Sequence, residues 1–215
     1  MSKYKAVIFD LDGTLLNTLE DLKDATNAAL ESKGMPVCTL EQVRQYVGNG
    51  VRKLMIRAVP DGEKNPLFEE TFAAFKEYYG AHCLDHTAPY PDIMQMMKAL
   101  KENGVKIAIV SNKLDSAVKE LNKQFFAAYT TSAIGEMDGV AHKPAPDMVN
   151  KALRELGVDK EDAVYVGDSD VDIATAKNSG LPCISVTWGF RDVEFLKEHG
   201  AKRLIESPLE LLYLV

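Results

Sequence analysis

Short, continuous runs of apolar residues alternate along the chain with segments of helical periodicity. The runs span residues 6–9, 105–110, 129–134, 163–166, 183–187 and 203–206. Because they are continuous rather than alternating, they are typical of strands covered by helices on both faces, as in parallel sheets. The helical segments 92–103, 146–156 and 170–179 are each followed by glycine, the residue that most readily ends a helix. This alternation predicts an α/β fold.

One long segment interrupts the alternation. Between about residues 17 and 84 the chain shows helical patterns and no strand. We predict helix starts at the capping boxes Thr18-x-x-Asp21 and Thr39-x-x-Gln42, because such side-chain pairs satisfy the first backbone N–H groups of a helix. A later helical pattern carries an aromatic stripe that we interpret as core, formed by Phe68, Phe72, Phe75 and Tyr79.

The patterns together predict two domains. Residues 1–16 and 85–215 would form a Rossmann-like core domain of three layers, with a parallel sheet between helices. Residues 17–84 would form an all-helical cap domain, inserted after the first strand.

Composition and charge narrow the possible partners and location. Apolar residues make up 46% of the chain and charged residues 27%, as in folded globular proteins. The net charge of −7 would repel a polyanion, so nucleic acid is not an expected partner. Three widely spaced cysteines favour reduced thiols. We find no export signal at the N-terminus and no apolar run near the about 18 residues of a membrane span, so we expect a cytoplasmic protein without membrane contact.

Two acidic clusters follow predicted strands. Asp10 and Asp12 come directly after the first strand, where alternate side chains point the same way and ligands of α/β proteins bind. Taken alone, such a pair is more often a turn satisfying local N–H groups. Asp168, Asp170 and Asp172 follow a later strand and begin a helix, where Asp170 has the alternative role of a helix cap.

If both strand ends meet, up to five carboxylates share one site. Two unit charges roughly 4 Å apart repel by about 4 kcal/mol at an effective dielectric near 20, so the cluster favours a bound cation. An all-oxygen ligand set indicates a hard ion, and we predict Mg²⁺. A calcium loop of the EF-hand type is excluded because Ile173 and Ser179 occupy its required glycine and glutamate positions.

Two further segments carry groups suited to an anion. Ser111, Asn112 and Lys113 follow another strand, and a hydroxyl with N–H groups at a helix start suits a phosphate oxygen. Ser111 is equally consistent with an ordinary helix cap. Lys143 lies in an extended segment stiffened by prolines, and taken alone it is consistent with a solvated surface lysine.

The order of the motifs D-x-D-G-T, S-N-K, K-P-x-P and G-D-x-x-x-D resembles the haloacid dehalogenase superfamily, in its phosphatase branch with a helical cap. Segments 47–51, 187–191 and 200–212 are similar to those of phosphoglycolate phosphatases and related pyrophosphatases. The resemblance implies a phosphoric monoester hydrolase, monomeric or homodimeric, acting on a small phosphorylated metabolite.

The resemblance also implies roles for the site residues. Asp10 would be the nucleophile that forms an aspartyl phosphate, and Asp12 the general acid and then the general base. Mg²⁺ would be held by Asp10, the main-chain carbonyl of Asp12, Asp168 and Asp172. The phosphoryl group would be bound by Ser111, Asn112 and Lys143. Candidate substrate contacts in the cap are Asn49, Arg52 and Lys53, beside a glycine-rich turn. The alternative is a turn that simply ends a helix, with its basic residues in solvent.

Several related activities remain open at this point. A phosphomutase of the β-phosphoglucomutase kind or a pyrophosphatase would share the whole core signature. A phosphonatase would use a cap lysine, for which Lys53 is the candidate, whereas a dehalogenase is disfavoured because its family lacks the second carboxylate that Asp12 supplies. From another class, a non-catalytic sensor of a phosphate ligand would keep the fold without turnover.

Overall fold

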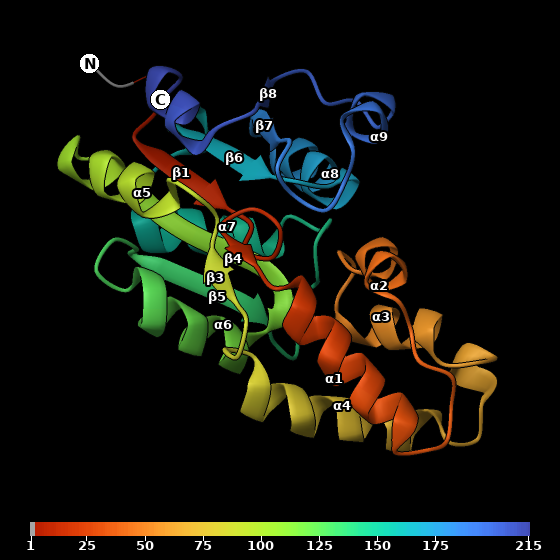
Figure 1. Cartoon of the computed structure of the whole chain (residues 1–215). Coiled ribbons are helices and arrows are strands. Elements are labelled where there is room, and N and C mark those ends of the chain that lie inside the picture. The colour runs from red at the N-terminus through yellow and green to blue at the C-terminus, as the bar shows by residue number, and fades with distance from the viewer. Residues whose placement is uncertain (1–2) are drawn as a thin grey trace. The chain divides into compact units, whose positions relative to one another are not determined.

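The computed structural model describes residues 3–215, and a six-stranded parallel sheet forms the centre of one of its two compact units (Figure 1). The strand order is β5-β4-β1-β6-β7-β8. The strands are β1 (Ala6–Phe9), β4 (Lys106–Leu114), β5 (Ser132–Glu136), β6 (Ala163–Gly167), β7 (Cys183–Val186) and β8 (Leu204–Ile205). Met1 and Ser2, part of the N-terminal segment used to argue against an export signal, lie outside the described residues.

Helices cover both faces of this sheet. Successive side chains of a strand point to opposite faces, so each strand contributes to the core on both sides. Val7 and Phe9 pack in one cluster with residues of α5 (Ile93–Glu102), α6 (Asp115–Leu121) and the 3₁₀ helix η4 (Pro208–Tyr213). Ala6 and Ile8 pack in a second cluster with residues of α7 (Asp147–Leu156) and α8 (Asp170–Ser179). The predicted three-layer α/β fold is therefore confirmed.

The remaining elements of this unit connect the strands. They are the π-helix η2 (Asn122–Phe126), the 3₁₀ helix η3 (Lys160–Asp162) and α9 (Val193–Glu198). Two short strands, β2 (Leu16–Asn17) and β3 (Ala88–Pro89), form a separate two-stranded sheet.

Strand register brings distant segments to one edge of the sheet. Phe9 at the end of β1 lies opposite Ile109 on β4 and Val166 on β6. Because the three strands are parallel, the chain leaves each of them on the same side. The segments that carry the predicted site residues therefore start from neighbouring points.

Strand β4 is longer than its apolar run predicts. It continues to Leu114, and α6 begins only at Asp115. The expectation that Ser111 lies at a helix start is therefore wrong. Pairing with β5 shifts in register after Val110 and resumes where Leu114 lies opposite Glu136, which keeps the intervening polar residues in the strand.

The chain divides into two compact units, one of residues up to Leu16 and from Pro89 to Val215, and one of Asn17–Ala88. The second unit contains α1 (Leu19–Glu31), α2 (Leu40–Tyr46), α3 (Val51–Ala58), the 3₁₀ helix η1 (Gly62–Lys64) and α4 (Phe68–His82). On α4 the predicted aromatic stripe is buried, with stacked ring pairs.

One of the two predicted capping boxes forms. The Thr39 side chain accepts from the Gln42 N–H and the Gln42 side chain accepts from the Thr39 N–H. The box at Thr18 is wrong, since that side chain makes no capping hydrogen bond. The buried carboxylate of Asp21 instead accepts from the N–H groups of His86 (2.8 Å) and Thr87 (2.9 Å), partners that are distant in sequence.

Within residues 3–215, no helix combines the length and the apolar character that crossing a bilayer requires. In this part of the chain Cys38, Cys83 and Cys183 form no disulfide bond.

Candidate active site

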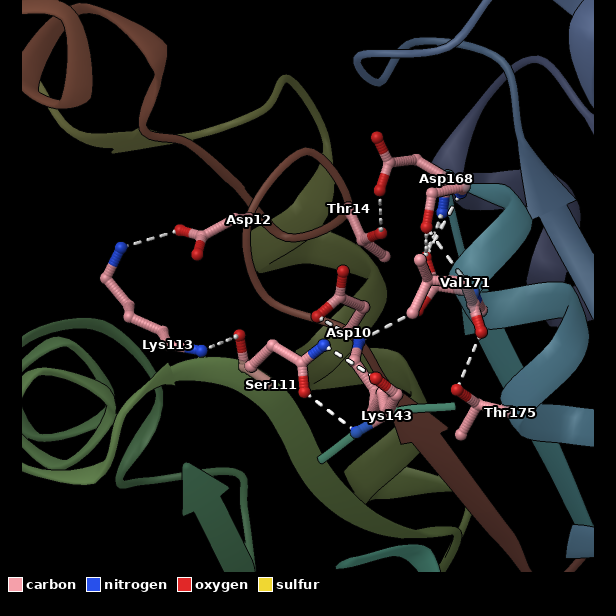
Figure 2. A network of polar contacts seen from close by, with 12 residues as sticks. Asp10, Asp12, Thr14, Ser111, Lys113, Lys143, Asp168, Val171 and Thr175 are labelled. Atoms are coloured by element: carbon pink, nitrogen blue, oxygen red, sulfur yellow. Dashed lines mark hydrogen bonds and ion pairs between the residues drawn. The ribbon is translucent and has the colours of Figure 1, made fainter. Parts of the chain in front are cut away.

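Three carboxylates converge at the edge of the sheet where β1 and β6 end. Oxygens of Asp10, Asp168 and Asp172 all lie within 4.8 Å of one another, and the three residues are at most 7% exposed. The expected convergence of the two acidic clusters is thus observed for three side chains. The carboxylate of Asp12 is turned toward Lys113 instead, as Figure 2 shows.

Lys143 supplies the positive charge at this cluster. Its Nζ lies 2.8 Å from Oδ1 of Asp10 (Figure 2). The same Nζ lies 2.8 Å from Oδ1 of Asp172, and the lysine is 5% exposed. Burial lowers the pKa of Lys143, but the two carboxylates more than offset that effect and hold the pKa well above its usual range. This lysine is therefore a buried cation and not a solvated surface residue.

The backbone of Lys143 is fixed by the side chain of Asn112. The N–H of Lys143 donates to Oδ1 of Asn112 (2.8 Å), and Nδ2 of Asn112 donates to the carbonyl of Lys143 (3.0 Å). Both groups are buried. The Asn112 amide thus ties β4 to the lysine-bearing segment.

Asp172 is held by donors on both of its oxygens. Oδ1 accepts from Nζ of Lys143 and from the hydroxyl of Tyr165 (3.1 Å). Oδ2 accepts from the N–H of Asp168 (3.2 Å) and from the N–H (3.1 Å) and hydroxyl (2.6 Å) of Ser169. Ser169 and Asp172 also form the capping box that begins α8. Asp172 therefore combines a helix-capping role with support of Lys143.

Burial without full charge compensation raises the pKa values of Asp10 and Asp168. Desolvation raises the pKa of Asp10 well above its usual range, Asp172 raises it further, and Lys143 opposes both effects. Desolvation, together with Asp172, raises the pKa of Asp168 to about 7, against the opposing N–H of Phe190. Three carboxylates share one lysine, so the cluster is deficient in positive charge. The atoms it offers as metal ligands are all oxygens. Such a set suits a hard divalent cation.

A second ion pair lies beside the cluster. Nζ of Lys113 is 2.8 Å from Oδ1 of Asp12, and the lysine side chain is only 1% exposed. The Ser111 hydroxyl accepts from the N–H of Lys113 (3.3 Å) and is buried on β4. Asp170, at the start of α8, lies at an intermediate level of exposure.

Three features of this site could not be predicted from the sequence. Lys113 has no predicted role, although it belongs to the S-N-K motif, and Tyr165 is predicted only as a strand residue. The third feature is the hydrogen bond from the N–H of Phe190 to Oδ2 of Asp168 (2.7 Å). For Tyr165 the available signal was a hydroxyl-bearing residue within an otherwise apolar strand. For Phe190 it was its place in the glycine-containing segment 187–191.

In the helical unit, two of the three candidate contacts already have partners. Arg52 forms ion pairs with Glu63 (3.1 Å) and Glu69 (2.5 Å), and Oδ1 of Asn49 accepts from Arg57 (2.8 Å). Lys53 is exposed.

The family is established by comparison with known proteins. A model of the haloacid dehalogenase-like hydrolase family matches residues 7–186, which is most of the chain. The protein belongs to the haloacid dehalogenase-like hydrolases. The family predicted from the four motifs is thus confirmed, and the chain is a hydrolase.

Individual proteins are similar to this chain in sequence and in structure. The phosphoglycolate phosphatase of Neisseria meningitidis is 35% identical over 204 residues, which are 93% of this chain and 87% of that protein. A crystal structure from Lactobacillus delbrueckii subsp. bulgaricus, described as a proposed phosphoglycolate phosphatase, superposes with a TM-score of 0.94 at 37% identity, covering 99% of both chains. CbbY from Rhodobacter sphaeroides, solved in complex with phosphate, gives 0.79 at 28% identity, covering 97% of this chain and 96% of that one.

Proposed function

We propose that the protein is a Mg²⁺-dependent phosphatase that hydrolyses a small phosphate monoester, similar to or identical with 2-phosphoglycolate, through an aspartyl-phosphate intermediate. The observation that carries the proposal is the position of Asp10, at the carboxyl end of β1, with Lys143 at 2.8 Å and Asp168 beside it. The names of the relatives support the substrate class, and the phosphate bound by CbbY supports the ligand.

In the proposed reaction a carboxylate oxygen of Asp10 attacks phosphorus, and the bond between phosphorus and the ester oxygen breaks. Asp12, protonated at this stage and therefore released from its ion pair with Lys113, gives its proton to the departing oxygen. Asp12 then takes a proton from water, whose oxygen attacks phosphorus, and the bond from phosphorus to Asp10 breaks. Free phosphate leaves and both aspartates return to their starting states.

The residues present fit a divalent cation. We assign its binding to Asp10, Asp168 and the main-chain carbonyl of Asp12. Asp172 would act in support, because five donors already occupy the about four lone-pair sites of its carboxylate, whereas Asp168 accepts from two. Bound there, the ion would offset the repulsion between the nucleophile and the anionic substrate.

Lys143 and Ser111 are the proposed contacts of the transferred phosphoryl group. A buried ammonium and a buried hydroxyl both donate to anionic oxygens, whose charge must be balanced as the group transfers. Asn112 is assigned a different role from the one its position in the motif suggested. Because its amide holds the backbone of Lys143, it would position that lysine.

We assign catalysis to the α/β unit and substrate selection to the helical unit as a cap. Lys53 is the proposed selective residue, since Arg52 and Asn49 are engaged within their own unit. A cytoplasmic location and the monomeric or dimeric state stay predictions.

A panel of phosphorylated metabolites tests the proposal. We expect kcat/KM for 2-phosphoglycolate to exceed that for pyrophosphate, sugar phosphates and p-nitrophenyl phosphate. Asp10→Asn should abolish turnover of every substrate, while Asp138→Asn, at an exposed turn, should leave it unchanged. Appreciable turnover by Asp10→Asn would remove Asp10 as nucleophile, and a preference for another ester would overturn the substrate assignment alone.

A further inference from the structure

The loop between β7 and α9 contacts the acidic cluster directly through Phe190 and indirectly through Thr14. The N–H of Phe190 donates to Oδ2 of Asp168 (2.7 Å). The indole Nε1 of Trp188 donates to the carbonyl of Thr14 (3.0 Å), and the Thr14 hydroxyl donates to Oδ1 of Asp168 (3.3 Å; Figure 2). The loop therefore holds one oxygen of Asp168 directly and the other through Thr14.

The backbone of this loop lies so close to Asp168 that only glycine fits at position 189. A Cβ there would lie 2.3 Å from Cβ of Asp168 and 2.5 Å from the carbonyl oxygen of Gly13. Real Cβ atoms essentially never approach other atoms so closely, and the second obstacle is main chain. The Asp168 carboxylate is thus enclosed by the loop on one side and by the turn at Gly13 and Thr14 on the other.

We propose that Trp188, Gly189 and Phe190 form a clamp that fixes the side-chain orientation of Asp168 and thereby sets the affinity of the site for a divalent cation. These are positioning residues, because they act through Asp168. The inference rests on the proposed function, in which Asp168 is a metal ligand. Partners that orient a metal ligand typically change metal affinity 10- to 100-fold when they are removed.

Binding of Mn²⁺ tests the clamp without any catalytic assay. Mn²⁺ prefers the same oxygen ligands as Mg²⁺, and the amplitude of its electron paramagnetic resonance spectrum reports the free ion. Competition with Mg²⁺ would show that both ions use one site. Wild type is compared with Gly189→Ala, with Trp188→Phe and with Gly80→Ala, a control on α4 where an added Cβ meets no atom within 4 Å. Melting temperatures of the metal-free proteins are measured in parallel.

We expect the Kd for Mn²⁺ to rise about 100-fold in Gly189→Ala and about 10-fold in Trp188→Phe, the two ends of that range. Gly80→Ala should bind as wild type does. Should Gly189→Ala fail to fold, Trp188→Phe decides, since it removes one N–H and keeps an aromatic ring. Kd values within twofold of wild type in the folded variants would overturn the clamp while leaving the proposed function intact. A wild-type protein that binds no Mn²⁺ would overturn the proposed function and the clamp with it.

Discussion

Replacing Asn112 by alanine separates a positioning role from direct phosphate binding. The change removes the hydrogen bonds of 2.8 and 3.0 Å to the backbone of Lys143 and leaves a buried N–H and a buried carbonyl without those partners. Each buried group left unsatisfied costs about 1–3 kcal/mol, and small rearrangements recover part of that cost. We therefore expect a loss of about 2–4 kcal/mol in the free energy of unfolding. For a chain of this size, that loss lowers the melting temperature by roughly 4–16 °C.

The matched control is Asn178→Ala. Its Nδ2 donates to the carbonyl of Pro144 (2.8 Å), the residue after Lys143, but from the exposed surface of α8. We expect that loss to stay within about 0.5 kcal/mol. For both variants, urea unfolding measures the free energy of unfolding, and the Ki of inorganic phosphate measures phosphate binding. A variant Asn112→Ala as stable as Asn178→Ala, with weaker phosphate binding, would refute positioning and restore direct contact with phosphate.

Three further predictions concern the metal, the phosphate contacts and the cap. EDTA should silence hydrolysis and Mg²⁺ restore it; activity that survives EDTA would contradict the metal assignment. Lys143→Ala should reduce kcat/KM more than Ser111→Ala, because a charge-assisted hydrogen bond is about twice as strong as a neutral one, and the reverse ranking would exchange their importance. Lys53→Ala should raise the KM for 2-phosphoglycolate. Arg52→Ala should leave that KM unchanged, since Arg52 is paired with glutamates of its own unit. An equal rise in KM for both variants would place both residues at the substrate.

The sheet and its order of elements could be predicted because the responsible signals are local. Strand Ala6–Phe9 and helix Asp170–Ser179 have the predicted bounds, since a continuous apolar run and a glycine stop act within a few residues. Strand β4 could not be delimited in the same way. Residues 111–113 near its end are polar, and the pairing with β5 that resumes where Leu114 lies opposite Glu136 is distant in sequence. Asp21 failed as a capping residue for the same reason, because N–H groups some 65 positions away provide its partners.

Within the site, the residue types could be predicted but their partners could not. The sequence placed Asp10 and Asp168 near one another through the parallel strands that precede them, whereas Lys143 was added to the site only by the resemblance to the family. It did not indicate that the Asp12 carboxylate pairs with Lys113, because both residues belong to motifs interpreted separately. Nor could it assign Asn112, whose place in the S-N-K motif is compatible with phosphate contact and with the observed bonds to the backbone of Lys143.

The hydrogen bonds of Asp172 distinguish it from the carboxylates that are proposed to react or to bind the metal ion. A carboxylate offers about four lone-pair sites, and five donors already address the oxygens of Asp172 from Lys143, Tyr165, Asp168 and Ser169. A metal ion at Asp172 would have to displace one of these donors, and the replacement would release either the buried lysine or the start of α8. Under the proposed function, binding the ion through Asp10 and Asp168 instead would leave Asp172 to hold Lys143 and the main chain of Asp168 in place. The most deeply buried acid of the cluster would then be the one whose charge maintains the site, while Asp10 reacts and Asp168 binds the ion.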